Sequence, residues 1–126
     1  MTTLLFVHGA WHGPWWQVDG DTFTPATPHD VFYNDVEPDV AAAAAARLQP
    51  QTYAAVTDRL TAAAWQAVPT TYVICDRDNA IPVFAQEAMS QRATHVERLS
   101  AGHSPFLSQQ DGLVRIVSRA SRAPSA

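Results

Sequence analysis

The sequence predicts an α/β fold with a short, mostly parallel sheet and flanking helices, and three observations carry this prediction. Apolar runs alternate along the chain with segments of helical composition, in the order strand, helix, strand, helix. The runs at residues 3–7 and 71–75 contain no alternating polar residue, which is typical of strands buried on both faces. Each run ends in a turn that leads toward a helix, and strands joined by crossover helices run parallel.

The N-terminal elements follow from this pattern. The strand at residues 3–7 ends at the glycine turn His8-Gly9. Residues 10–16 contain Gly13-Pro14 and three tryptophans, which predicts a loop. Residues 17–27 are polar and then punctuated by proline, so we expect a linker or surface segment.

Prolines mark the start of two helices in the middle of the chain. Thr27 is a candidate N-cap with proline at the first helical position, which predicts a helix through residues 29–34. Pro38-Asp39 opens the alanine-rich residues 40–48, and alanine has the highest intrinsic helix propensity. Residues 61–68 are expected to form one or two helical turns.

The C-terminal elements begin with the strand at residues 71–75, which an acidic turn at residues 76–79 follows. Ile81-Pro82 starts a helix that we expect to reach residue 92. Residues 95–99 alternate between polar and apolar side chains, which predicts a third strand. An amphipathic helix is expected over residues 107–119. For the earlier helix, which Ile81-Pro82 starts, the expected apolar positions are Val83, Phe84, Ala88 and Met89.

Composition excludes several classes of partner. The chain has 126 residues, which suits one domain, and a net charge of −4 in which all eight cations are arginine. An acidic chain without a basic run is a poor ligand for nucleic acid or anionic membranes. The longest apolar run, residues 40–46, is far shorter than the ~20 residues of a membrane span. The single cysteine, Cys75, forms no internal disulfide, so we expect a cytoplasmic protein.

Asp78 and His103 are the residues that best fit acid–base chemistry. They are 25 residues apart, and each follows a predicted strand in a turn before a helix. Open α/β sheets place functional groups at such strand ends, and a carboxylate there can orient an imidazole as a general base. The alternative is structural: Asp78 caps the helix that begins near Pro82, and His103 occupies a turn.

Residues near the first strand suggest weaker sites. Gly9 permits a sharp turn that would point the Ala10 N–H outward, where it could donate to an oxyanion, although a structural turn explains it equally. The pair His8 and His12 has the spacing of metal ligands on a helix, but the glycines around it disfavour a helix, so we expect no metal. The tryptophans here fit either an apolar pocket or ordinary core.

Several motifs together resemble the α/β-hydrolases, in the branch that holds plant methylesterases, salicylate-binding esterases and hydroxynitrile lyases. Leu5-Phe-Val-His-Gly-Ala-Trp-His-Gly-Pro-Trp15 is similar to the oxyanion loop of that branch. Tyr72-Val-Ile-Cys-Asp-Arg-Asp-Asn-Ala-Ile-Pro82 is similar to its triad-acid loop, and Gly102-His-Ser-Pro-Phe106 to its histidine loop. Val31-Phe-Tyr-Asn-Asp35 and Ala46-Arg-Leu-Gln-Pro-Gln51 resemble its cap region.

The resemblance implies a partial α/β-hydrolase fold and roles for individual residues. Asp78 would be the triad acid, His103 the triad base and Ala10 an oxyanion donor, with Trp11 and His12 in the substrate pocket. The implied domain covers residues 1–117, with a cap-like segment at about residues 20–66. We expect residues 118–126 to form a disordered tail.

One part of the family pattern is missing from the sequence. The chain contains no G-x-S-x-G motif and no serine before Ser90, so no nucleophile is assigned. The pattern passes from Trp15-Trp16 almost directly into the cap-like segment, as though half of a full-length member were absent. The apolar strand at residues 3–7 would then present an exposed sheet edge, which favours homo-oligomers.

Three functions remain open on the sequence alone. The chain is a relative of carboxylic-ester hydrolases that is capable of at most weak hydrolysis, with no cofactor. Alternatively, it binds a small apolar ester or carboxylic acid without turnover. The third reading is an incomplete chain without independent function.

Overall fold

A parallel pair of strands organises the C-terminal half of the protein. The computed structural model describes residues 16–122. Strand β4 (Thr71–Cys75) and strand β5 (His95–Leu99) lie in parallel register, with Thr71 opposite His95 and Cys75 opposite Leu99. Helix α4 (Val83–Ser90) makes the crossover between them. The carboxyl ends of both strands therefore meet at one edge, and the loops that leave them lie side by side.

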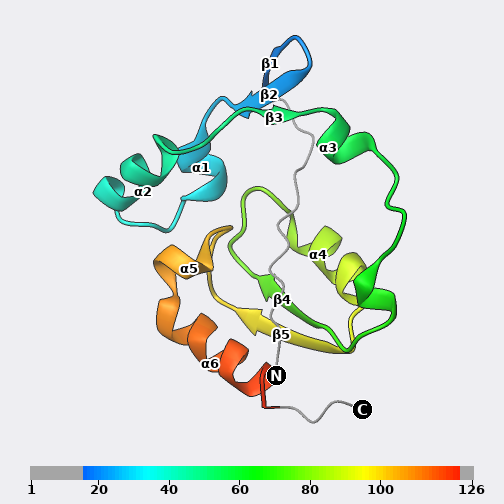
Figure 1. Ribbon diagram of the computed structural model, residues 1–126. Helices are drawn as coiled ribbons and strands as arrows, with labels where there is room; N and C mark the ends of the chain where they lie inside the picture. The colour runs from blue at the N-terminus through cyan, green and yellow to red at the C-terminus, as the bar shows by residue number, and fades with distance from the viewer. Residues whose placement is uncertain (1–15, 123–126) are drawn as a thin grey trace.

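Helices cover this strand pair on two sides. Helix α4 packs against β4 and helix α6 (Gln110–Ala120) against β5, on opposite sides of the strands in Figure 1. The buried Ile116 lies between Leu113 and Val117, at the spacing of a helix with one apolar face. The helix predicted at residues 107–119 is instead two helices, because the chain turns at Gln109 after α5 (Pro105–Ser108).

A small antiparallel sheet lies above this unit and was not predicted. Strands β1 (Trp16–Asp19), β2 (Thr22–Pro25) and β3 (Gln51–Thr52) pair in that order. Gly20 has a φ of 58°, which the two-residue hairpin between β1 and β2 requires at its first turn position. Of the two alternatives predicted for residues 17–27, the linker is therefore wrong and the surface segment is confirmed, since polar residues alternate on an exposed hairpin.

The remaining described elements are two helices between β2 and β3 and two short helices between β3 and β4. They are α1 (Pro28–Phe32), α2 (Pro38–Ala45), α3 (Ala54–Thr57) and the 3₁₀ helix η1 (Ala64–Gln66). Val31 of α1 packs against Ala80 and Ile81 in the loop after β4, with Met89 of α4 alongside. This apolar cluster fixes α1 above the carboxyl ends of the strands, as Figure 1 shows.

The strands at residues 71–75 and 95–99 and the helices opened by Pro28 and Pro38 are confirmed. The predicted buried face of α4 is wrong in part, because Phe84 is 75% exposed whereas Gln86 and Ser90 are buried. The expected boundary at residue 117 lies inside α6, which continues to Ala120, so the disordered tail does not begin at residue 118.

Some expectations fall outside the described residues. These are the strand at residues 3–7, the sheet edge expected on it, and the glycine turn and candidate site residues expected at residues 8–12. Within residues 16–122, no helix combines the length and the apolarity that crossing a membrane requires.

Candidate active site

The loops after β4 and β5 bring Asp78 and His103 together. The Nδ1 atom of His103 lies 2.9 Å from Oδ2 of Asp78 and 3.1 Å from Oδ1. The side chains are 4% exposed for Asp78 and 18% exposed for His103. Because a carboxylate oxygen accepts a hydrogen bond, the proton of the neutral imidazole belongs on Nδ1, and Nε2 keeps its lone pair. This arrangement suits a general base.

The backbone of its own loop holds the Asp78 carboxylate. The N–H groups of Ala80 and Ile81 donate to Oδ1 at 2.7 Å and 2.9 Å. Both donors lie within three residues of Asp78, so the turn forms around the side chain, as is typical of aspartate in turns. The carboxylate is therefore oriented toward His103 before any ligand binds.

An aromatic ring covers one face of the imidazole. Phe32, the last residue of α1, stacks on His103 with ring centroids 5.0 Å apart and an interplanar angle of 30°. Asn79, beside Asp78, donates through Nδ2 to the carbonyl oxygen of Asp30 at 2.9 Å. The segment that resembles a cap region thus touches both loops of the pair.

The described residues near the pair offer no thiol nucleophile. Cys75 at the end of β4 is buried, and burial together with the charges of Asp78, Asp35 and Asp76 raises its thiol pKa to about 11. Burial and the Asp78 charge also raise the pKa of the Tyr72 hydroxyl. A thiol reacts as its thiolate, so Cys75 is a packing residue, as its place in a buried strand predicts.

The other predicted site residues lie outside the described part of the chain. They are Ala10, Trp11 and His12, together with His8 of the candidate metal pair. Within residues 16–122, no group of three or more histidine, cysteine or acidic side chains is arranged to hold a metal ion.

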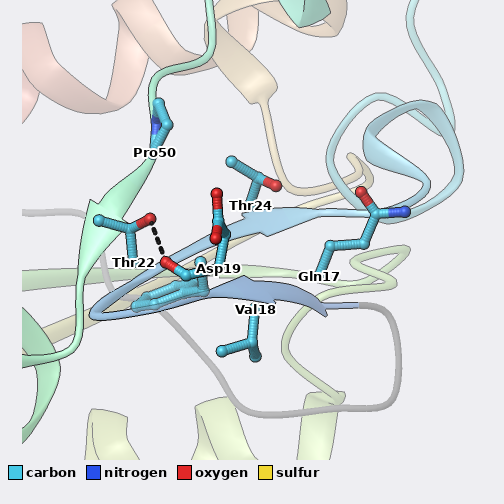
Figure 2. Close-up of a pocket in the computed structure, with 7 residues that line it drawn as sticks. Gln17, Val18, Asp19, Thr22, Thr24 and Pro50 are labelled. Carbon is cyan, nitrogen blue, oxygen red and sulfur yellow. Dashed lines mark hydrogen bonds between the residues drawn. The ribbon is translucent and has the colours of Figure 1, made fainter.

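A hollow lies away from this pair, on the β1–β2 hairpin. It has a volume of about 560 Å³, and Figure 2 shows Gln17, Asp19 and Thr24 around it, with Pro50 at the approach to β3. Thr22 donates through Oγ1 to the carbonyl oxygen of Asp19 at 3.0 Å, which closes the turn. Neither Asp78 nor His103 lines the hollow, so it does not mark the site.

Four further side chains around the pair were not predicted from the sequence. They are Phe32, Asn34, Asp35 and Arg77, and each contacts a loop that carries Asp78 or His103. A signal was present, because Asn34-Asp35 is a polar pair directly after an apolar helix. Its role was not evident, since the partners are distant in sequence.

The chain is similar to known proteins in sequence and in structure. The model of the alpha/beta hydrolase family matches residues 15–116. The alpha/beta hydrolase nvfD of Aspergillus novofumigatus is 38% identical over 94 residues, covering 72% of this chain and 38% of that protein. The crystal structure of the pyrethroid hydrolase PytH with BIF matches with a TM-score of 0.70 and 21% identity, over 87% of this chain and 48% of that one.

This chain therefore spans less than half the length of either relative. The structural match supports the predicted partial α/β-hydrolase fold, and the family model covers most of the sequence, including Asp78 and His103. The chain belongs to the alpha/beta hydrolase family.

Proposed function

We propose that the chain carries the acid–base part of a site for hydrolysis of small apolar carboxylic esters, within the methylesterase-like branch of its family. His103 is the general base and Asp78 orients it. The observation that carries the proposal is the 2.9 Å contact between His103 Nδ1 and an Asp78 carboxylate that is 4% exposed. Ala10 as an oxyanion donor and Trp11 and His12 as pocket residues belong to the same proposal.

In the proposed reaction, Nε2 of His103 takes a proton from water while the water oxygen attacks the ester carbonyl. The tetrahedral intermediate then collapses, the bond to the alcohol breaks, and the imidazolium returns its proton to the leaving oxygen. Asp78 stabilises the imidazolium through Nδ1–H in both steps. The products are one carboxylic acid and one alcohol, and no cofactor takes part.

The expected rate is low because the sequence has no nucleophile elbow. Removal of the serine from a Ser-His-Asp site lowers turnover by about 10⁶-fold in measured cases. General-base catalysis by a positioned side chain contributes about 10²–10⁴-fold. Slow turnover of activated esters is therefore the activity that the pair supports.

The test compares hydrolysis of p-nitrophenyl acetate by the unaltered protein and by His103→Ala. We expect the hydrolysis rate above background to be about 10²-fold lower in the variant. His95→Ala is the matched control, because His95 lies exposed on β5 outside the site and its loss should leave the rate unchanged. Equal rates for His103→Ala and the unaltered protein would refute the proposal.

A second candidate is binding without turnover, and the absence of a G-x-S-x-G motif favours it. Here the pair and Phe32 would hold the carboxylic acid or ester itself. Titration calorimetry with acetate esters and short apolar acids distinguishes the two. This candidate is supported if the unaltered protein binds such a ligand saturably without hydrolysing esters and His103→Ala binds it more weakly. It is rejected if the titration gives no saturable heat.

A further inference from the structure

Residues 30–35, here the bridging segment, tie together the two loops of the candidate site. Asn79 donates to the carbonyl oxygen of Asp30, and Asn34 donates through Nδ2 to the carbonyl oxygen of Arg77, each at 2.9 Å. These two bonds hold the loop that carries Asp78. Hydrogen bonds between segments more than 40 residues apart are a specific feature of the tertiary fold, since no local turn produces them.

The same segment holds the loop that carries His103. Oδ2 of Asp35 accepts the N–H of Gly102 at 2.6 Å, and the Asp35 side chain is 9% exposed. Gly102 directly precedes His103, so this bond fixes the peptide unit from which the imidazole projects. A buried carboxylate that accepts a backbone N–H forms a strong, charge-assisted hydrogen bond.

Arg77 completes the contact between the loops. The backbone N–H of Arg77 donates to the carbonyl oxygen of Ala101 at 2.9 Å, and its side-chain Nη2 donates to the carbonyl oxygen of Ser100 at 2.7 Å. Nη2 also lies 3.6 Å from Oδ2 of Asp35. Three successive residues, 100–102, are thereby held from the acid loop and from the bridging segment.

The packing at Gly102 leaves no room for a side chain. A Cβ atom on this glycine would lie under 3.0 Å from Oδ1 of Asn34 and Oδ1 of Asp35. Both of these oxygens are buried and have no hydrogen-bond partner among residues 16–122. Gly102 is therefore a position of close approach between the bridging segment and the loop that carries His103.

We propose that Asp35 is a positioning residue, whose carboxylate holds Gly102 so that the His103 imidazole stays in register with Asp78. It acts through the backbone and touches neither the substrate nor the reacting atoms. The catalytic consequence rests on the proposed function, whereas the positioning itself does not. Displacement of a catalytic group by about 1 Å lowers rates by about 10²-fold, so the bond matters for turnover.

The experiment compares Asp35→Ala with Asp35→Asn and with Asp30→Ala. Asp30 is the matched control because it lies in the same segment and its carboxylate is 77% exposed. The primary measurement is the ¹⁵N-edited NMR signal of His103 Nδ1–H, under conditions where circular dichroism shows each variant to be folded. A role limited to stability would leave this signal in place in the folded protein.

We expect Asp35→Ala to speed exchange of the Nδ1 proton with water and to lower p-nitrophenyl acetate hydrolysis, each by about tenfold. Asp35→Asn should retain both properties, because its carboxamide oxygen can accept the Gly102 N–H. Asp30→Ala should match the unaltered protein. An Asp35→Ala variant with an unchanged Nδ1–H signal overturns the proposal.

Two further outcomes separate the proposals. If Asp35→Ala loses the Nδ1–H signal, the positioning role is supported. If His103→Ala at the same time hydrolyses the ester as fast as the unaltered protein, the proposed function is rejected. If Asp35→Ala does not fold, hydrogen exchange of the unaltered protein decides. The Gly102 amide should be protected as strongly as the amides of β4, and free exchange at Gly102 overturns the positioning role.

Discussion

Asp78 serves its own loop and the facing histidine mainly through different oxygen atoms. Oδ1 accepts the N–H groups of Ala80 and Ile81, and Oδ2 makes the shorter contact with His103. The structural alternative, in which Asp78 caps the following helix, is not observed, because α4 begins at Val83 without a side-chain cap. One short acidic side chain thus forms the turn and presents the acceptor.

Asp78→Asn should separate these two roles. The carboxamide keeps one oxygen for the turn but presents an NH₂ group that cannot accept from His103 Nδ1–H, so the wrong imidazole tautomer is favoured. We expect esterase activity to fall by about 10²-fold or more. The control is Asp76→Asn, because the Asp76 carboxylate pairs with Arg98 outside the site. Activity that survives in Asp78→Asn would contradict the assigned role.

The raised thiol pKa of Cys75 predicts a measurable loss of stability at alkaline pH. Its thiol pKa is about 11 in the folded protein against an ordinary value of 9.0, so the fold favours the protonated thiol. That stabilisation is complete below pH 9 and is lost as the pH rises through about 11. A shift of this size corresponds to about 2–3 kcal/mol.

Urea unfolding at several pH values between 8 and 11 checks this prediction. The free energy of unfolding should fall less steeply with pH in Cys75→Ala than in the unaltered protein. The tyrosines Tyr33 and Tyr72 also have raised pKa values and act in the same direction. They are present in both proteins, so the difference between the curves reports the Cys75 thiol together with its smaller effect on the pKa of Tyr72. Parallel curves would show that the thiol does not titrate as expected.

At the scale of elements, a buried glutamine joins α4 to the end of β4. Gln86 is 2% exposed, and its Oε1 accepts the N–H of Cys75 at 2.8 Å while its Nε2 donates to the carbonyl oxygen of Cys75 at 3.0 Å. Nε2 also donates to the carbonyl oxygen of Ile81 at 2.8 Å. The amide pairs with Cys75 as a neighbouring strand would, at the point where the chain leaves the sheet.

Gln86→Ala should destabilise the protein by about 2–4 kcal/mol, because three hydrogen bonds to buried backbone groups are lost. Gln91→Ala is the control, since Gln91 is exposed at the end of the same helix. Equilibrium unfolding in urea measures both. A loss in Gln86→Ala no larger than that in Gln91→Ala would show that water or a neighbouring group replaces the amide.

At the scale of the molecule, the chain divides into a packed part and an exposed part. Residues 71–120 form the strands, helices and loops that hold Asp78 and His103. Residues 53–69 carry short helices with mostly exposed side chains, including Leu60 at 78% exposure. Segments with few buried contacts open most readily, so local stability should be lowest there.

Limited digestion with trypsin should therefore begin at Arg59 among the internal sites. Arg59 lies between α3 and η1 in an exposed stretch, whereas Arg98 lies in β5 and pairs with Asp76 and Glu87. Mass spectrometry of early fragments checks the order of cleavage. Arg59→Gln should slow the appearance of the first internal fragment, and initial cleavage at Arg98 would show that the sheet opens first.

Local pattern accounts for most of the elements. Residues 71–75 form a strand whose end, Ile74 and Cys75, is buried, and residues 95–99 pair with it. The prolines at 28 and 38 start helices because their φ suits the first turn. The pairing of Asp78 with His103 follows from parallel strands that end at one edge. The hairpin at residues 16–25 was not recognised, since its polar surface resembles that of a loop.

What the sequence determined by itself is the order strand, helix, strand, helix over residues 71–120, the ends of those strands and the presence of an acid and a histidine beyond them. Only the tertiary structure decided how the bridging segment contacts both loops, with Asp35 and Gly102 separated by 67 residues. It also decided that Gln86 rather than Phe84 is buried on α4. Periodicity reports which residues face a core, but the partners of a buried polar group depend on chain segments far away in sequence, and no local pattern contains them.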